Sequence, residues 1–287
     1  MLFLRLFFIT CFALLCSTAQ ALTPAQIASV TAFMSKQPNP NVNTNGIGIY
    51  VYDGINSLDA LGPYRVFKTA GLNAFLIAQK KGTITTNDKL KIEVDKSIDE
   101  VSKLDILLIP GGAYETSLQT QDPVILDWIR QIDATTVYTT SVCTGSWILG
   151  ATGLLEGKNA TSNWYRAKEM MEKYGAIFKE ERWVKDGKYW TSAGVSAGMD
   201  MALAIVLDLF GEEYTQAVML DLEYNPQPPV KGGSVKKSPV KVRQYMRWMY
   251  DYFLLPFVKS TPTPVTTDDT HGCVAPEQWM PSMGHCM

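Results

Sequence analysis

Two hydrophobic patterns alternate along the chain from Gly46 to about Gly211. Short runs of consecutive apolar, often β-branched residues are typical of strands buried on both sides, whereas apolar residues three or four positions apart are typical of helices that pack by one face. The runs predict strands at 47–52, 73–79, 104–110 and 135–142, and a half-exposed strand at 90–95. The helical spacing predicts helices at 58–70, 122–132, 143–155 and 194–211.

This order of elements predicts a single α/β domain over residues 46–235. Continuous apolar strands that alternate with helices indicate a mostly parallel sheet covered on both faces. Residues 22–45 are polar and are interpreted as a leader or linker with a short helix at 24–37. Residues 236–287 are interpreted as a C-terminal extension, because the composition there changes to Lys, Pro and aromatic residues.

The first 21 residues have the pattern of a secretory signal peptide. Arg5 precedes an apolar run that continues to about Cys16, and Ala19-Gln20-Ala21 supplies a small-residue cleavage site. A lipoprotein signal that ends at Cys16 and a buried N-terminal helix are the alternatives. We therefore expect an exported protein, periplasmic or secreted after cleavage at Ala21, with no membrane-spanning segment in the mature chain.

Composition narrows the possible functions. With 46% hydrophobic and 19% charged residues in 287 positions, the chain can bury a substantial core, which excludes disorder and coiled coil. The formal charge of −2 provides no broad basic field, so we expect no nucleic-acid partner. The two histidines, His271 and His285, lie in the last 17 residues, so histidine-dependent catalysis in the domain would have to recruit one from the tail.

Cys143 is the principal candidate for a catalytic residue. It lies at the carboxyl end of a predicted strand, where open parallel sheets place their ligand sites, and Thr144-Gly145 follows at the start of a helix. A helix N-terminus can lower a thiol pKa from ~8.5 and so generate the nucleophilic thiolate. The alternative is that Cys143 is a small buried apolar residue.

Two other segments are expected at the same edge of the sheet. Gly111-Gly112 follows a strand directly, and its backbone amides could donate hydrogen bonds to a developing anion; the alternative is a plain tight turn. Asp59 follows the first strand at the start of a helix. Like charge and burial beside a thiolate would raise the pKa of Asp59, keeping a proton available near neutral pH, whereas the alternative is an ordinary helix cap.

The sequence around these residues resembles the DJ-1/PfpI superfamily, and specifically its isocyanide hydratase branch. The similar stretches are YDGINSLDALGPYRVF, IPGG, SVCTGSWILGATGLLEGKNATSNW, TSAGVSAGMDMAL and EYNPQPP, which cover about 46–235. The resemblance implies a flavodoxin-like three-layer sandwich, a nucleophile elbow at Cys143 and a homodimer. It also implies that Asp59 is the carboxyl partner of the cysteine, that Thr144 is a polar neighbour of the substrate, and that Gly112 belongs to the anion-stabilising turn, with Gly111 and Gly145 beside it.

The expected function is therefore hydration of an isocyanide to an N-substituted formamide through a thioimidate on Cys143, with no metal and no cofactor. Proteases and amidotransferases that resemble this fold have a histidine directly after the cysteine, where this chain has Thr144. One departure from the hydratase pattern is Ser162-Asn163-Trp164, where hydratase-like sequences commonly read T-H-W. Alternatives are a redox-sensing or glyoxal-reactive DJ-1-like protein and, less favoured, the ligand-sensing half of an AraC-type transcription regulator.

The extension carries two further features. His271, Cys273, His285 and Cys286 include the donors of a zinc site, but their spacing is unlike zinc fingers and an exported chain meets oxidising surroundings. A Cys273–Cys286 disulfide is therefore the favoured prediction. The aromatic and basic run 243–257 is predicted to pack on its own domain or on a partner subunit, with a membrane-surface or protein-docking helix as the alternative.

Overall fold

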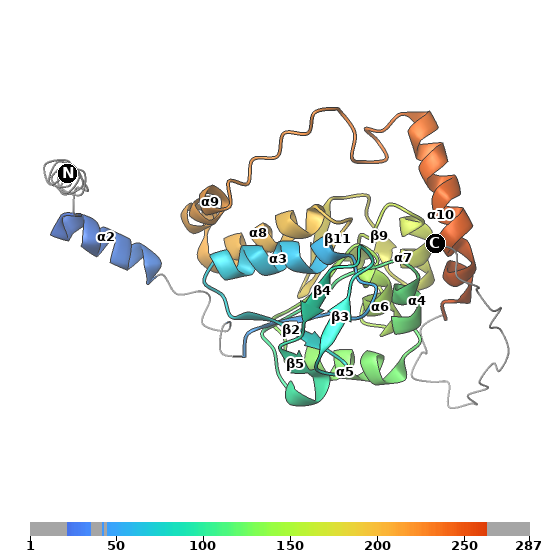
Figure 1. The fold of residues 1–287 in the computed structure, drawn as a ribbon, viewed down its shortest axis with the longest axis horizontal. Coiled ribbons are helices and arrows are strands. Elements are labelled where there is room, and N and C mark those ends of the chain that lie inside the picture. Colours follow the sequence, from blue (N-terminus) through green and yellow to red (C-terminus); the bar gives the residue numbers. More distant parts are fainter. Residues whose placement is uncertain (1–21, 36–41, 43–44, 263–287) are drawn as a thin grey trace, which may run out of the picture.

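The computed structural model of the protein describes residues 22–35, 42 and 45–262 (Figure 1). The predicted signal peptide and the tail with Cys273 and Cys286 lie outside these residues, so both remain predictions. Among the described helices, none is both long and apolar enough to cross a membrane.

The centre of the domain is a seven-stranded sheet. Its strands are parallel except at one edge, where β10 runs antiparallel to β11, and their order across the sheet is β10-β11-β7-β6-β1-β2-β5. The strands are β1 (Ile47–Tyr50), β2 (Ala74–Ala78), β5 (Lys96–Ser97), β6 (Ile106–Ile109), β7 (Tyr138–Val142), β10 (Trp183–Asp186) and β11 (Tyr189–Ser192). Every residue of β1, β2, β6 and β7 is buried; β1, β2 and β6 are continuous apolar runs, as is typical of strands covered on both faces, whereas β7 also buries Thr139, Thr140 and Ser141.

Helices cover both faces of this sheet because the chain changes direction within it. From β1 the chain moves to β2, whereas from β6 it moves the opposite way, to β7 and then β11. Right-handed crossovers therefore place α3 on one face and α5 and α6 on the other. On the first face α3 packs against α8, and on the second α5 packs against α6. The structure confirms the predicted three-layer α/β sandwich with a mostly parallel sheet.

The helices are α2 (Pro24–Met34), α3 (Ser57–Thr69), α4 (Tyr114–Gln119), α5 (Pro123–Asp133), α6 (Gly145–Ala151), α7 (Ala167–Lys173), α8 (Ala197–Phe210), α9 (Glu212–Asp221) and α10 (Val240–Ser260), with a 3₁₀ turn, η1, at Ile98–Glu100. Two pairs of short strands lie outside the central sheet: β3 (Thr83–Thr85) with β4 (Lys91–Glu93), and β8 (Asn159–Ala160) with β9 (Ile177–Phe178).

Two hairpins differ from the predicted elements, and α4, α7, α9, β5 and the β8–β9 pair lie where no element was predicted. The predicted strand at 90–95 forms β4, which pairs only with β3 in a separate hairpin, because its alternating pattern leaves Lys91 and Glu93 exposed rather than covered by a second layer. The edge hairpin β10–β11 was not predicted, although its two-residue turn, Gly187-Lys188, begins with a glycine whose positive φ of 60° such turns require.

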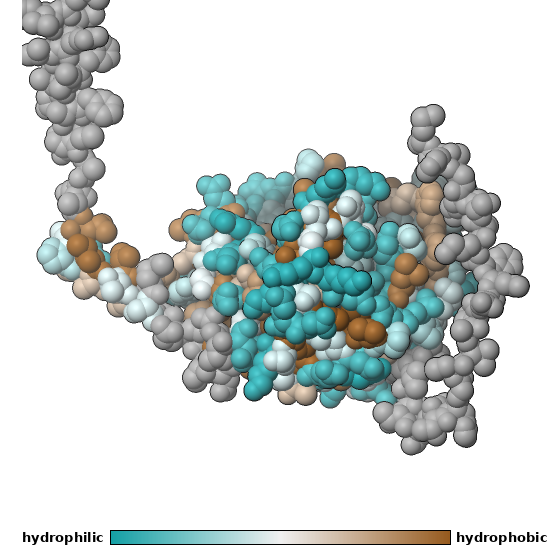
Figure 2. Space-filling view, turned by 60° about the horizontal axis from the view of Figure 1, so that its bottom comes forward, coloured by the Kyte–Doolittle hydropathy of each residue, from teal (hydrophilic) through white to brown (hydrophobic). Residues whose placement is uncertain are grey.

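The two flanking helices lie at opposite ends of the molecule. α2, the short helix predicted in the leader, begins with a capping box at Thr23 and exposes Ile27 and Val30, and Figure 2 shows its hydrophobic side chains apart from the mostly hydrophilic face of the domain. α10 follows a long stretch without helix or strand, residues 222–239, and runs along the side of the domain next to α4 (Figure 1). One side of the aromatic run, which includes Tyr250 and Leu254, thus packs on its own domain, one of the two predicted outcomes, whereas Tyr245, Trp248 and Tyr252 remain exposed.

Candidate active site

Three adjacent strands end at one edge of the sheet, and each is followed by a predicted site residue. Asp59 lies in the first turn of α3 after β1, Gly111-Gly112 follows β6, and Cys143 follows β7. β1 and β6 are the neighbours between which the chain reverses its direction across the sheet, and ligands in open α/β sheets bind at such switch points.

Cys143 occupies a sharp turn between β7 and α6. Its φ of 60° is in the left-handed region, which is costly for a residue with a Cβ and is found mainly where surrounding structure holds it. Its N–H continues the sheet by donating to the Ser192 carbonyl at 3.0 Å, and its carbonyl accepts hydrogen bonds from the hydroxyls of Ser146 and Ser162 at 3.0 and 3.2 Å. These contacts hold the strained backbone of Cys143 from both sides.

Two glycines allow the turns after β6 and β7 to approach each other. A Cβ on Gly145 would lie 2.1 Å from the carbonyl oxygen of Ile109, and a Cβ on Gly111 would lie 2.6 Å from the backbone nitrogen of Thr144. Neither contact is possible for a larger residue without moving backbone. Neither glycine lines the cavity above the thiol, so Gly111 and Gly145 act by permitting this packing rather than by contacting a ligand there.

The Asp59 carboxyl is fully buried beside Cys143. Asn56 caps α3 through its side chain and donates its backbone N–H to the Gly111 carbonyl at 2.9 Å, which ties the start of the helix to the turn after β6. The Gly111 N–H donates to Asp59 Oδ2 at 3.2 Å, whereas Oδ1 has no hydrogen-bond partner among the described residues. Burial raises the pKa of Asp59 to about 7, although hydrogen bonding from the Cys143 thiol and from Gly111 opposes the rise.

The pKa of Cys143 is shifted in the direction opposite to our expectation. Burial raises it well above its ordinary value, and the negative charge of Asp59 raises it further. Hydrogen bonds from the Thr144 N–H and from Asn163 oppose the rise but do not outweigh it. The predicted stabilisation of a thiolate by the helix N-terminus is therefore wrong for the resting site: Cys143 is a neutral thiol at pH 7.

The backbone amides of the Gly111-Gly112 turn also differ from the prediction. The Gly111 N–H donates to Asp59, and the Gly112 N–H donates to Thr144 Oγ1 at 3.0 Å. Both predicted oxyanion donors are thus occupied in this structure, and the turn positions Asp59 and Thr144. Thr144 Oγ1 in turn lies 3.0 Å from the Gly112 carbonyl and 3.2 Å from the hydroxyl of Thr116, within a buried hydroxyl cluster.

Asn163 contacts the thiol. In the sequence this residue was visible only as a departure from a motif. Its Nδ2 donates to Cys143 Sγ at 3.2 Å, and its Oδ1 accepts the backbone N–H of Tyr165 at 3.0 Å. The amide is buried, so both of its hydrogen bonds are made in a low-dielectric environment, which strengthens them. Asn163 is therefore a neutral hydrogen-bond donor to sulfur at the position where the resembling sequences have a histidine.

A cavity of about 210 Å³ opens above the thiol. Its walls come from the turn at Gly112, from Cys143 and Thr144, from loops of the domain, and from α10; the lining residues are Asn56, Asn87, Gly112, Ala113, Cys143, Thr144, Asn163, Tyr165, Val195, Met249, Tyr250, Phe253 and Leu254. None of these side chains carries a charge at neutral pH, and Asp59 lies behind Cys143 rather than in the lining. The cavity thus suits a neutral, largely apolar ligand.

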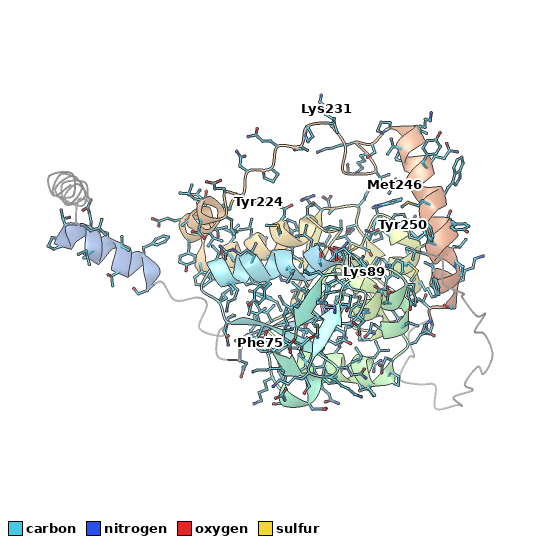
Figure 3. The ribbon with its side chains drawn as sticks, in the orientation of Figure 1. Phe75, Lys89, Tyr224, Lys231, Met246 and Tyr250 are labelled. Atoms are coloured by element: carbon cyan, nitrogen blue, oxygen red, sulfur yellow. The ribbon has the colours of Figure 1, made fainter. Side chains whose placement is uncertain are left out.

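Tyr250 also lines the cavity, and no pattern in the sequence connected it with Cys143. It projects from the side of α10 that faces the domain (Figure 3) and packs against the rings of Trp164 and Tyr165, with centroids 5.2 and 5.1 Å away. Burial raises the pKa of Tyr250, and Cys143 and Asp59 raise it further when they are ionised. The described residues contain no group of three or more His, Cys, Asp or Glu side chains arranged to hold a metal ion.

Comparisons with known proteins agree with this arrangement. The model of the DJ-1/PfpI family matches residues 46–208. An isonitrile hydratase of Pseudomonas putida is 36% identical over 197 residues, which cover 68% of this chain and 86% of that protein. A crystal structure of a THiJ/PfpI family protein from Pseudomonas syringae superimposes with a TM-score of 0.72 at 32% identity, covering 82% of this chain and 95% of the other. The HTH-type transcriptional regulator CdhR of Pseudomonas aeruginosa is 28% identical over 133 residues, 39% of its length.

Proposed function

The chain belongs to the DJ-1/PfpI family, and from this premise we propose that it is a cysteine-dependent hydratase that converts an isocyanide, R–N≡C, into the N-substituted formamide, R–NH–CHO. The observation that carries the proposal is the pairing of a neutral Cys143 thiol with Asp59, whose pKa is about 7, beneath an uncharged cavity. The name of the Pseudomonas putida relative, isonitrile hydratase, supports the same reaction.

The first chemical step uses both groups. Asp59, ionised in part of the molecules at neutral pH, accepts the thiol proton as Cys143 Sγ forms a bond to the terminal carbon of the isocyanide. Asp59 then delivers that proton to the same carbon, which gives the thioimidate Cys143–S–CH=N–R. A carboxyl group with a pKa near the working pH is suited to both halves of this transfer, because neither protonation state is costly to reach.

Water completes the reaction. It adds to the thioimidate carbon while the nitrogen takes up a proton, and the resulting adduct expels Cys143 as the thiol, leaving the formamide. The sum is one isocyanide and one water converted to one formamide, so the chemistry requires no redox partner. We assign Thr144 and Asn163 to the polar side of the reacting centre, since both line the cavity next to Sγ and Asn163 donates to the sulfur.

The alternatives have less support. Redox-sensing cysteines are accessible and have a lowered pKa, whereas Cys143 is buried and its pKa is raised. Among residues 222–262, which follow α9, the structure forms one helix, α10, where the sensor half of an AraC-type regulator would be followed by two helix-turn-helix units.

Two further parts of the proposal come from the sequence alone: export after cleavage at Ala21, and assembly as a homodimer.

A formamide assay tests the proposal. The purified protein is offered methyl, cyclohexyl and phenyl isocyanide, with methylglyoxal as the comparison substrate, and products are identified by mass spectrometry. Cys143→Ala should reduce turnover to the uncatalysed rate, and Asp59→Asn should lower kcat by about 100-fold or more, the range of general acid–base catalysis. Asp127→Asn, an exposed carboxylate paired with Arg130 on α5, serves as the control and should leave turnover unchanged. The hydratase would be refuted if no isocyanide yields a formamide while the protein consumes methylglyoxal or Cys143 is oxidised by peroxide.

A further inference from the structure

The first half of α10 is exposed on every side. Each of residues 240–249 is exposed, and this half projects beyond the sheet and its covering helices, whereas the second half lies beside α4 (Figure 1). A helix of about ten residues is marginally stable in water unless it packs against something. The exposed residues of this half include six large apolar side chains: Val240, Val242, Tyr245, Met246, Trp248 and Met249. An apolar surface of this kind marks an interaction site.

Aromatic side chains form a stripe along the outer side of α10. Tyr245, Trp248 and Tyr252 are three or four positions apart, which places them on one side of the helix, and they are 52%, 56% and 80% exposed. The Tyr245 and Trp248 rings contact each other, with centroids 5.9 Å apart. Trp and Tyr concentrate where a membrane meets water, because their rings are apolar while the N–H or O–H stays hydrated.

Contacts with the domain fix which side of α10 faces outwards. Asp251 accepts hydrogen bonds from the Tyr165 hydroxyl at 2.8 Å and from Arg166 at 2.9 Å. Phe257 packs on Tyr114 of α4, with ring centroids 5.0 Å apart. The helix cannot turn its aromatic stripe towards the domain without breaking these contacts, so the stripe is held in an outward position.

A basic stretch leads into this helix. Between Tyr224 and Tyr250 the chain has six basic residues and no acidic one, whereas all 28 acidic residues and the other 20 basic residues lie elsewhere. The six are Lys231, Lys236, Lys237, Lys241, Arg243 and Arg247. Within the described part of the chain, Lys236 is the only one of them with a salt bridge, to Glu180 at 3.3 Å, and Figure 3 shows Lys231 away from the sheet. Such a local excess of positive charge attracts anionic lipid headgroups.

Two basic residues lie on the same side of α10 as the aromatic stripe. Lys241 is four residues before Tyr245, and its Nζ lies 5.5 Å from the centroid of that ring. Lys259 is seven residues after Tyr252 and is exposed as well. Aromatic rings between two long basic side chains suit a helix that lies in the plane of a membrane surface, because the rings enter the headgroup region while the ammonium groups reach the phosphates.

Two other partners fit this surface less well. Single-stranded nucleic acid also binds basic and aromatic residues, but it does so in grooves, whereas these rings stand on the convex outer side of one helix. A symmetric dimer formed through α10 would place the basic stretches of two copies against each other, which is unfavourable.

We propose that α10 and the basic stretch before it dock this protein onto an anionic phospholipid bilayer. Tyr245, Trp248 and Tyr252 enter the headgroup region, Lys241 and Lys259 bind lipid phosphates at the two ends of the stripe, and the remaining basic residues provide longer-range attraction. The docking surface is separate from the chemistry at Cys143 and does not depend on which reaction occurs there.

Vesicle co-sedimentation tests the docking. Residues 22–287 are used, because the apolar run before Ala21 would itself bind lipid. Binding is measured with vesicles of phosphatidylcholine alone and of equal parts phosphatidylcholine and phosphatidylglycerol. In about 0.05 M NaCl the partition coefficient should be at least about 10-fold higher for the anionic vesicles, and the difference should shrink in about 0.5 M NaCl because salt screens the attraction. Equal partition into the two kinds of vesicle would overturn the proposal.

Matched variants assign the binding to α10. Trp248→Ser combined with Tyr252→Ser should lower the partition coefficient about 10-fold or more, whereas Leu207→Ser combined with Leu220→Ser, which changes two exposed apolar residues on α8 and α9, should not.

Charge reversal is tested in the same way. Lys241→Glu combined with Lys259→Glu should also lower the partition coefficient about 10-fold or more, whereas Lys80→Glu combined with Lys103→Glu, the same charge change at exposed positions of the domain, should have a smaller effect. Equal losses in the α10 variants and their controls would overturn the assignment to this helix.

A spectroscopic readout locates the helix in the bilayer. Phosphatidylglycerol with brominated acyl chains should quench the tryptophan emission of the wild type, and Trp248→Phe should bind equally well but lose most of this quenching. Two further measurements oppose the proposal: binding to oligouridylate without binding to vesicles would make the surface a nucleic-acid site. A dimer that dissociates in the Trp248→Ser, Tyr252→Ser variant, again without vesicle binding, would make it a contact with a second copy.

Discussion

Replacing Asp59 by asparagine should stabilise the protein at neutral and alkaline pH even though it removes the proposed proton carrier. The Asp59 side chain is 0% exposed and its Oδ1 has no hydrogen-bond partner within the part of the chain that the structure describes, so its ionised form is poorly solvated. Burial raises its pKa from 3.8 to about 7. An asparagine at this position keeps an oxygen that accepts the Gly111 N–H and carries no charge at any pH.

The sign of the effect follows from proton linkage. Below pH 4 the carboxyl is protonated in both the folded and the unfolded chain, so it causes no pH-dependent loss. Between pH 4 and 7 the unfolded chain releases the proton while the folded chain retains it, and folding stability falls as the pH rises. Above about pH 7 both states are ionised and the loss is complete. The rise in pKa from 3.8 to about 7 corresponds to about 4 kcal/mol at 1.36 kcal/mol for each pH unit.

The assay is urea unfolding of both proteins at pH 4, 6 and 8 at constant ionic strength. The free energy of unfolding of Asp59→Asn relative to the wild type should rise between pH 4 and 8 by about 4 kcal/mol. The control is Asp105→Asn. The buried Asp105 carboxylate accepts hydrogen bonds from the N–H groups of Asn45 and Gly46 at 3.0 Å, so its replacement should destabilise the protein. Parallel pH profiles for Asp59→Asn and the wild type would refute the reasoning, as would a lower stability of Asp59→Asn at pH 8.

Two further predictions concern the thiol and the turn beneath it. Asn163→Asp keeps the acceptor for the Tyr165 N–H but replaces the donor to Cys143 Sγ by a carboxylate, so the pKa of Cys143 should rise further and its alkylation at pH 8 should slow at least about 10-fold, since the lost hydrogen bond of ~1.4 kcal/mol and the added negative charge act in the same direction. Asn87→Ala, which changes a cavity amide that does not bond the sulfur, is the control, and an unchanged pH–rate profile in Asn163→Asp would contradict the role of that amide. Gly145→Ala places a methyl group 2.1 Å from the Ile109 carbonyl and should lower the free energy of unfolding by about 3 kcal/mol, measured by urea unfolding. Gly232→Ala, where the nearest atom is 4.0 Å away, should have no effect, and equal stability of the two variants would refute the close approach.

The strands and helices that build the core were predictable because their pattern is local. Strands β1, β2, β6 and β7 are buried on both faces, and the amphipathic helix α5 has its Asp122 cap and its apolar stripe in consecutive residues. The meeting of Asp59 and Cys143 was predictable as well, because each directly follows a parallel strand and such strands end at one edge. The edge hairpin β10–β11 was missed although the glycine of its two-residue turn is a local signal.

The protonation of the site and the identity of its walls could not be predicted in the same way. The sequence suggested a thiolate at Cys143 from its place before a helix, but the sign of the pKa shift depends on burial by residues from many segments together with the Asp59 charge. Asn163 was visible as a departure from a motif, yet only the structure places its amide 3.2 Å from sulfur. Tyr250 lies in the aromatic run that was predicted to pack on the domain, but no local pattern assigned it to the cavity, because its helix reaches the cavity after a long stretch without regular structure.

By itself, then, the sequence determined the α/β fold and the pairing of an acid with a cysteine, since both follow from local hydrophobic patterns and from the geometry that all parallel sheets share. Tertiary structure alone decided that the cysteine rests as a thiol, that an amide donates to its sulfur, and that α10 covers the cavity. The physical reason is that desolvation and enclosure are properties of the packed molecule: they are summed over residues far apart in the chain, and no short stretch of sequence contains them.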